Sequence, residues 1–162
     1  MEPNVRTSCR AIIVNPENEI LLIRIENPLA EWKGWITPGG GIDKDESHEQ
    51  ALRRELREEL GLKRFSFEGP VWTRFHKFPW AGKWFEQTEF YYLVLIDKFE
   101  PKPTVDPSAD EMKDFRGFKW WRFEDIAKSK DNFAPRHLEQ HLATLVRVGI
   151  PEKPIDVSDP EV

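Results

Sequence analysis

The sequence predicts an α+β fold, in which helices lie on both faces of a mixed β-sheet as an α/β/α sandwich. Two observations favour this class: strand-like apolar runs follow one another along the chain, and helical patterns stand between and after them. A third is size, since 162 residues with 39% hydrophobic side chains suit one packed domain. We expect this domain to span residues 1–150, followed by a flexible tail at 151–162.

The first elements predicted are a β-hairpin and a short strand that leads into glycines. Two β-branched apolar runs, at residues 9–14 and 20–25, flank the turn signal NPENE and form the hairpin. A loop at residues 26–34 follows, and the short strand WIT enters the glycine cluster TPGGG.

A helix follows the glycines. Its predicted N-cap is Asp43 or Asp45, because aspartate accepts hydrogen bonds from the first free N–H groups of a helix. The helical pattern runs to about Leu60 and stops at Gly61, which is a typical C-terminal residue of a helix.

The rest of the chain predicts three more strands and two helices. Strands at residues 65–78 and 84–97 are joined by PWAGK. A segment rich in Pro and Asp, at residues 100–117, is a long loop, and FKWWRF after it is a strand. The segments EDIAKSK and APRHLEQHLATLVRVG are helices, the second with Pro135 near its first turn.

Composition excludes several classes of function. The formal net charge of −5 provides no basic face, so we expect no general binding of DNA or RNA. Cys9 is the only cysteine, which excludes an intramolecular disulfide and a cysteine-based metal site. No apolar run reaches membrane-spanning length, and the first residues do not resemble a signal peptide. The expectation is a cytoplasmic enzyme or binding protein without a membrane segment.

Three glutamates of the helix, Glu55, Glu58 and Glu59, share one face because residues at i, i+3 and i+4 do so. Their mutual repulsion would raise their pKa values without a nearby positive charge. Arg54, four residues before Glu58, can supply one. A hard divalent cation such as Mg²⁺, which prefers carboxylate oxygens, can supply another. From the charges alone, a solvated helix held by ion pairs is the simpler interpretation.

The spacing of the whole segment resembles the signature of the Nudix hydrolase family, G-x5-E-x7-R-E-U-x-E-E-x-G-U, in which U is aliphatic. Every fixed position is filled, by Gly40, Glu46, Arg54, Glu55, Leu56, Glu58, Glu59, Gly61 and Leu62. The resemblance extends more weakly over roughly residues 6–149 and includes the FKWWRFEDI strand and helix. It implies the Nudix fold, with a mixed β-sheet between helices.

The resemblance also implies a reaction. Nudix enzymes hydrolyse a nucleoside diphosphate linked to another group, and Mg²⁺ or Mn²⁺ assists the attack of water on phosphorus. By matched position, Glu58 and Glu59 bind the metal, and Glu55 binds it or acts as the base. Arg54 orients the glutamates, and the carbonyl of Gly39, just before the motif, is a further metal ligand.

Members of the family also use an acidic residue from outside the motif, and Glu89 is our first candidate. It interrupts the apolar strand FEQTEFYYLVLI, where a buried carboxylate needs a metal, an arginine or water as its partner. Exposure near a strand end is the alternative. Asp110 and Glu111, in the long loop, are further candidates, although ordinary loop charge is the simpler interpretation of both.

Substrate contacts are expected from one cation and two aromatic rings. Arg24 ends the strand that often lines the pocket in this family, so it is a candidate for phosphate binding. Trp32 and Trp80 stand in loop contexts, where their rings can stack on a nucleobase.

We expect hydrolysis of a nucleoside triphosphate or a nucleotide sugar, with release of a nucleoside monophosphate. The alternative is a Nudix-fold nucleotide-binding or regulatory module without turnover, which the complete set of glutamates disfavours. Action on 5′-capped RNA is disfavoured by the acidic balance of the chain. Homodimers are common in the family, so a homodimer is a further possibility that the resemblance implies.

Overall fold

The structure, a computed structural model, describes residues 4–27, 31–80, 82–105 and 114–159. The strands described there are β1 (Asn4–Val14), β2 (Glu19–Asn27), β3 (Trp32–Ile36), β4 (Gly39–Gly41), β5 (Glu68–Trp80), β6 (Lys83–Leu95), β7 (Phe115–Arg122), β8 (Phe133–Ala134) and β9 (Ile155–Asp156). The helices are α1 (His48–Leu60), α2 (Phe123–Lys128) and α3 (Leu138–Val148). Within these ranges, no helix is both long and apolar enough to cross a membrane.

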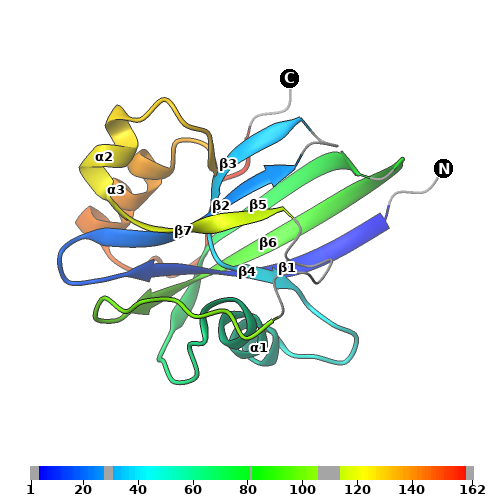
Figure 1. Ribbon diagram of the computed structural model, residues 1–162, viewed down its shortest axis with the longest axis horizontal. Coiled ribbons are helices and arrows are strands. Elements are labelled where there is room, and N and C mark those ends of the chain that lie inside the picture. Colours follow the sequence, from blue (N-terminus) through cyan, green and yellow to red (C-terminus); the bar gives the residue numbers. More distant parts are fainter. Residues whose placement is uncertain (1–3, 28–30, 81, 106–113, 160–162) are drawn as a thin grey trace.

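Strand β1 lies inside the sheet and determines where the glycines lie (Figure 1). One edge of β1 runs parallel to β6 over its whole length. Its other edge meets β2 at a single pair, Val14 and Ile20, while β2 pairs further along with β3 and β7. On the same edge, residues 8–10 pair with the three glycines of β4. The sheet therefore splits beside β1, and the glycine strand lies in the split.

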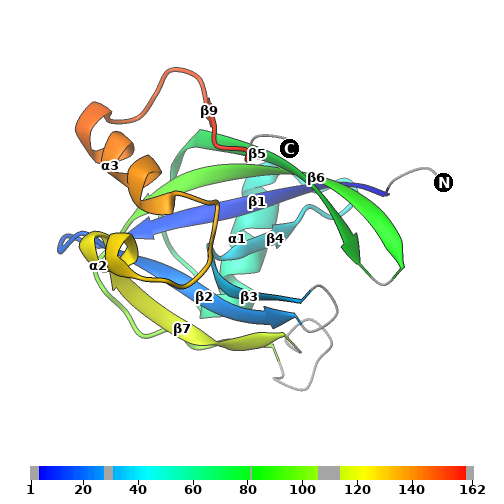
Figure 2. The same cartoon turned by 90° about the horizontal axis from the view of Figure 1, so that it is seen from above.

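The two faces of the sheet carry separate hydrophobic cores, because alternate residues of β1 point to opposite sides. Figures 1 and 2 show α1 on one side of the sheet and α2 and α3 on the other. The α1 side buries Cys9, Ala11, Ile13, Ala51, Leu52, Leu56 and Leu60. The opposite side buries Ile12, Val14, Trp72, Tyr91, Leu138 and Leu142. This arrangement confirms the predicted α+β sandwich with a mixed sheet.

Helix α1 begins at a different cap from the one predicted. Its N-cap is Ser47, not Asp43 or Asp45. The Ser47 hydroxyl accepts from the N–H of Gln50 at 3.1 Å, and the Gln50 side chain accepts from the N–H of Ser47 at 2.8 Å. This reciprocal capping box satisfies two free donors, whereas one aspartate side chain would satisfy fewer. The predicted end is confirmed, since Gly61 has the left-handed φ of 69° and closes the helix.

The C-terminal elements differ from prediction at their borders. Strand β5 begins at Glu68, so residues 65–67 of the predicted strand lie outside it. Helix α3 begins at Leu138 and not at residue 134. The reason is that Phe133 and Ala134 pair with β3 as a short parallel strand.

The segment after residue 150 is attached to the sheet. Ile155 and Asp156 pair in parallel with β5, and Val157 is buried in the core under α3. The N–H of Val157 donates to the carbonyl of Thr73 at 2.8 Å. Residues 155–157 therefore belong to the sheet and not to the flexible tail predicted from residue 151. Backbone pairing with the edge of β5 and burial of the Val157 side chain hold this segment in place. The sequence pattern did not reveal either interaction.

Candidate active site

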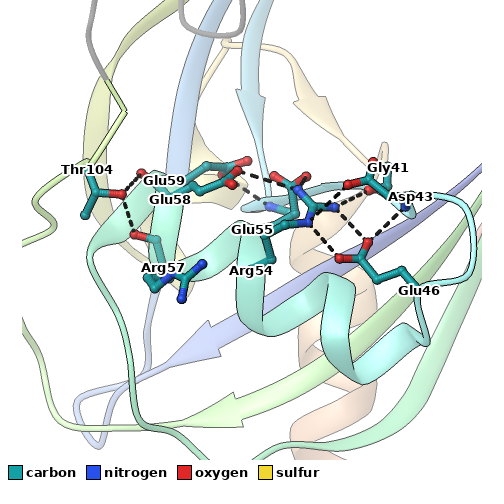
Figure 3. Close-up of polar contacts among 10 residues, drawn as sticks. Gly41, Asp43, Glu46, Arg54, Glu55, Arg57, Glu58, Glu59 and Thr104 are labelled. Atoms are coloured by element: carbon teal, nitrogen blue, oxygen red, sulfur yellow. Dashed lines mark hydrogen bonds and ion pairs between the residues drawn. The ribbon is translucent and has the colours of Figure 1, made fainter.

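The glutamates of α1 open onto a cavity of about 540 Å³ between α1, β4 and the strands β2 and β7. Figure 3 shows Glu55, Glu58 and Glu59 on one side of α1, with Arg54 beside them. The rest of the described lining comprises Arg6, Ile23, Ile25, Ile36, Gly39, Gly40, Gly41, Asp43, Arg54, Val105, Phe115 and Phe118. The structure thus brings the glutamates of the motif together with its glycines, and an apolar wall faces them.

The glycines are required because the backbone passes very close to its neighbours. A Cβ atom on Gly39 would lie 2.1 Å from the carbonyl oxygen of Cys9, and the φ of Gly39 is 139°. A Cβ atom on Gly40 would lie 2.6 Å from the carboxyl carbon of Glu55. Only a residue without a side chain fits between β1 and this carboxylate. The glycine cluster therefore lets backbone and glutamate share the same small space.

Arg54 connects the glutamates to one another (Figure 3). Its Nη1 donates to Glu55 at 2.8 Å, and its Nε and Nη2 donate to the two oxygens of Glu46 at 2.8 and 2.9 Å. Nη2 also donates to the carbonyl of Gly41 at 2.9 Å, and Glu58 lies 3.5 Å from Nη1. The hydrogen bonds from Arg54 lower the pKa of Glu46 to about 2. Arg54 therefore orients carboxylates, as the resemblance implies.

Glu59 lies beside Glu55 and against the glycine strand. Its Oε2 accepts from the N–H of Gly39 at 3.3 Å. Burial, and then the carboxylate of Glu55, raise the pKa of Glu59, although the charge of Arg10 acts in the opposite direction. The cavity cluster, which comprises Glu46, Arg54, Glu55, Glu58 and Glu59, thus has more negative charge than Arg54 alone can balance.

The cavity cluster fits a hard divalent ion by donor chemistry. All its possible metal-binding atoms are carboxylate oxygens, and its four glutamates outnumber its one arginine. Among the described residues, no three His, Cys, Asp or Glu side chains are arranged so that they could hold an ion as they stand. Mg²⁺ does not require such a cage, because it usually binds one or two carboxylates together with waters and substrate phosphates.

Glu89 lies on β6 and does not belong to the described lining of the cavity. Its carboxylate is 4% exposed and accepts from Arg10 Nε at 2.6 Å and from Arg74 Nη1 at 2.7 Å. His76 lies 3.3 Å away, and the hydroxyl of Tyr91 donates at 3.3 Å. Burial would raise the pKa of Glu89, but Arg10, and then His76 and Arg74, lower it well below its usual range.

These contacts define the buried cluster, which comprises Arg10, Arg74, His76 and Glu89. A buried Glu89 was expected to need a metal, an arginine or water as its partner, and the structure provides two arginines. A carboxylate held by two guanidinium groups is a weak base, and the structure does not place Glu89 among the motif glutamates. Glu89 is therefore not expected to act as the catalytic base.

Arg24 also lies away from the cavity. Its neighbours Ile23 and Ile25 line the cavity, so the alternation of β2 points Arg24 to the opposite face. There its guanidinium lies 5.5 Å from the centroid of the Trp35 ring and 3.5 Å from Glu26. Strand β2 lines the cavity, as expected of this strand, but Arg24 on it points to the opposite face of the sheet.

Of the two predicted tryptophans, Trp32 is not brought to the site. Trp32 is partly buried at the start of β3, outside the described lining of the cavity, and its ring edge covers Gly34. The side chain of Trp80 lies outside the described residues, as do Asp110 and Glu111.

Sequence reasoning missed three residues of the cavity, Arg6, Phe115 and Phe118. Arg6 precedes the predicted start of its strand, and Phe115 falls in the predicted loop. The rings of Phe115 and Phe118 contact each other, with centroids 4.7 Å apart. Phe118 stood in a predicted strand, but only the pairing of β7 with β2 shows which side it faces.

The fold and the cavity together define a small α+β hydrolase, whose acidic groups come from one helix. The sequence model of the NUDIX domain matches residues 5–142, so the chain belongs to the Nudix family. Its enzyme class is that of the Nudix pyrophosphohydrolases.

Three known proteins illustrate the similarity. The chain is 24% identical over 156 residues to Nudix hydrolase 25 of Arabidopsis thaliana, covering 89% of this chain and 87% of that protein. It is 33% identical over 102 residues to an RNA pyrophosphohydrolase of a Nitratiruptor species, covering 57% of this chain and 61% of that protein. Its fold matches the NUDIX domain of Shewanella oneidensis NrtR complexed with ADP ribose, with a TM-score of 0.63 and 21% identity, covering 91% of this chain and 90% of that one.

Proposed function

We propose that the chain hydrolyses a phosphoanhydride link between a nucleoside phosphate and a second group, and releases a nucleoside monophosphate. The observation that carries this proposal is that Glu55, Glu58 and Glu59 meet Arg54 and a glycine strand at one cavity. Acidic oxygens and close backbone are what a pyrophosphate site with a divalent ion needs.

The ion is proposed to be Mg²⁺ or Mn²⁺, held by Glu55, Glu58 and Glu59 with the carbonyl of Gly39 as a further donor. When bound, it would offset phosphate charge and lower the pKa of a bound water. The support is the donor chemistry of the cavity cluster and its excess of negative charge.

The chain itself would position and deprotonate the attacking water. The water oxygen forms a bond to phosphorus, the anhydride oxygen leaves with its electron pair, and Glu55 takes the proton of the water. The 2.8 Å hydrogen bond from Arg54 fixes Glu55 at the cavity, so its carboxylate is oriented before the substrate arrives.

The apolar wall is proposed to contact the nucleobase. Phe115 and Phe118 lie in the same cavity as the glutamates, and Arg6 adds a cation for the phosphates. These residues replace Arg24 and Trp32, which lie elsewhere. The presence of ADP ribose in the NrtR domain supports a nucleotide as the ligand class.

The substrate is proposed to be a nucleoside triphosphate or a nucleotide sugar. A second candidate, favoured by the name of the Nitratiruptor relative, is the 5′ phosphate end of an RNA. The net charge of −5 argues against extended contacts with an RNA chain, so only its end would need to enter the cavity.

The test is product analysis by phosphorus NMR in water labelled with heavy oxygen. The panel comprises nucleoside triphosphates, nucleotide sugars, dinucleoside polyphosphates, NADH and a 5′-triphosphorylated RNA oligonucleotide, each with Mg²⁺. We expect a nucleoside monophosphate, label in one phosphate product, and no activity in the presence of a chelator. Phosphomonoesters should not react, because they lack the second phosphate that shares the ion.

Two results would contradict the proposal. Cleavage that persists in excess chelator would remove the ion from the mechanism. Inorganic pyrophosphate, a diphosphate without a nucleobase, is run beside the panel, and its cleavage without cleavage of any nucleotide would keep the chemistry but exclude base contacts by Phe115 and Phe118.

A further inference from the structure

The turn between β3 and β4, at residues 37–39, is held by the side chain of Arg10. The Nη1 atom of Arg10 donates to the carbonyl oxygens of Thr37 and Gly39, at 3.2 Å each. Between them, the N–H of Ala11 donates to the carbonyl of Pro38 at 2.8 Å. Since Thr37, Pro38 and Gly39 are all buried, these contacts take the place of water for their carbonyls.

The other end of the same guanidinium is fixed by Glu89. Arg10 Nε donates to one carboxylate oxygen of Glu89 at 2.6 Å, and Arg74 Nη1 donates to the other at 2.7 Å. A planar guanidinium that is bonded through both Nε and Nη1 has only one orientation available. Arg10 therefore transmits the position of Glu89, on β6, to the turn.

Gly39 joins this contact to the cavity cluster. Its carbonyl accepts from Arg10, and its N–H donates to Glu59 Oε2 at 3.3 Å. A shift of the turn would therefore move the hydrogen bond that holds Glu59. The contacts run without a gap from Glu89 through Arg10 and Gly39 to a motif glutamate.

We propose that Arg10, anchored by Glu89, is a positioning residue that holds the turn at residues 37–39 and thereby sets the place of Glu59 and of the Gly39 carbonyl. The effect of the turn on metal binding and turnover rests on the proposed function. The hydrogen bonds that hold the turn do not depend on that proposal. Glu89 acts through Arg10 and not on the substrate.

Arg74 provides a matched control. Both arginines contact the same carboxylate at nearly the same distance, and both side chains are mostly buried, with 16% exposed for Arg10 and 11% for Arg74. In the part of the chain that the structure describes, Arg10 donates to the carbonyls of Thr37 and Gly39, whereas the hydrogen bond of Arg74 goes to Glu89. If Arg10 served merely to neutralise Glu89, Arg10→Gln and Arg74→Gln would have the same consequences.

The first measurement is amide hydrogen exchange of Gly39, followed by NMR in the metal-free protein. We expect Arg10→Gln to speed the exchange of the Gly39 amide by about tenfold, because the turn loosens and its bond to Glu59 weakens. Arg74→Gln should change it less than about twofold. Arg10→Lys should not restore slow exchange, because an ammonium group does not reproduce the planar bridge.

The second measurement is Mn²⁺ binding, followed by electron paramagnetic resonance. Removal of a residue that orients a metal ligand typically costs about tenfold to a hundredfold in affinity, so Arg10→Gln should weaken binding by at least about tenfold and Arg74→Gln by far less. Neither measurement needs a substrate, so a failure of the proposed reaction is distinguished from a failure of this inference.

Unchanged Gly39 exchange in Arg10→Gln would overturn the inference, as would equal effects of Arg10→Gln and Arg74→Gln. Should Arg10→Gln fail to fold because Glu89 keeps a poorly compensated charge, the double variant Arg10→Gln/Glu89→Gln removes both charges. It should show the same rise in Gly39 exchange, and slow exchange there would equally contradict the positioning role.

Discussion

The cavity cluster and the buried cluster lie on opposite faces of the sheet and have opposite compositions. In the cavity cluster, one guanidinium contacts three glutamates, whereas in the buried cluster two guanidiniums enclose one glutamate. Glu59 accordingly has a raised pKa and Glu89 a lowered one, although burial acts on both in the same direction. At Glu59 burial is the largest effect and prevails, whereas at Glu89 the charges of Arg10, His76 and Arg74 together outweigh it, so the positive charge around each carboxylate decides the sign of its shift.

The comparison teaches where the molecule needs a ligand. The buried cluster is compensated by its own side chains, so it can act as a rigid support for the turn. The cavity cluster is not, and a bound cation would complete it. The predictions below test this difference, beginning with the largest expected effect.

Removing one carboxylate charge from the cavity cluster should abolish most activity and spare the fold. We expect Glu58→Gln to lower kcat by about a hundredfold or more, because the amide keeps the shape of the side chain but binds a cation weakly. Glu49→Gln is the matched control, since Glu49 lies on the same helix but pairs with Arg53 at the surface. Steady-state kinetics at saturating Mg²⁺ and circular dichroism measure both quantities. Near-normal turnover in Glu58→Gln would remove this residue from the site.

Removing the carboxylate charge from the buried cluster should instead affect stability. We expect Glu89→Gln to lower the free energy of unfolding by about 3 kcal/mol, because two buried guanidiniums lose their common counter-charge. Glu86→Gln on the same strand is the control, and its exposed contact with Lys77, at 3.9 Å, should be worth less than about 1 kcal/mol. Urea denaturation compares the two variants. Equal losses of unfolding free energy in the two variants would show that the buried cluster contributes no more to stability than an exposed ion pair does.

The contributions of Glu59 and Glu89 to stability should depend on pH with opposite signs. The pKa of Glu89 is lowered on folding, so its contribution to stability is present above the ordinary value of 4.5 and is lost as the pH falls below it. The pKa of Glu59 is raised on folding, so its contribution is present below 4.5 and is lost as the pH rises through the raised value.

Denaturation of the metal-free protein across the pH range measures this difference. In Glu89→Gln, the free energy of unfolding should fall less steeply as the pH is lowered below 4.5. In Glu59→Gln, it should fall less steeply as the pH is raised toward neutrality. A common response of both variants would contradict the opposite charge balance of the clusters.

The smallest expected effect concerns the start of α1, outside both clusters. Ser47→Ala should lower the free energy of unfolding by about 1 kcal/mol, because the N–H of Gln50 loses its acceptor. Asp45→Gly is a suitable control, since Asp45 is not the N-cap and its left-handed φ of 66° suits glycine. A larger loss from Asp45→Gly than from Ser47→Ala, measured by urea denaturation, would contradict the observed capping box.

The features that the sequence predicted well are those that depend on local spacing. Glu55, Glu58 and Glu59 lie on one face because helical periodicity places them there, and no distant part of the chain can alter this. The capping box of Ser47 and Gln50 is equally local, with a serine followed three residues later by a glutamine, but the prediction of Asp43 or Asp45 as the N-cap missed it.

The features that it predicted poorly depend on which way a strand faces. Arg24 and Glu89 were placed near the motif, but the side of the sheet to which each points is determined by long-range pairing. Arg6 and Phe115 reach the cavity for the same reason, since the split beside β1 and the pairing of β7 with β2 bring them there. A single sequence contains no local pattern for such an arrangement.

The central position of β1 also limits how its length can change in evolution. Cys9 faces the helix of the motif, while its neighbour Arg10 holds the turn through the opposite face. One inserted or deleted residue ahead of Arg10, with the pairing to β6 kept, would exchange the two faces for everything before it. Arg6 would then lose its present place beside Gly41 at the cavity. Point substitutions in β1 change one contact at a time, whereas a change of length there would dismantle the entrance to the site, so we expect this strand to vary in composition but not in length.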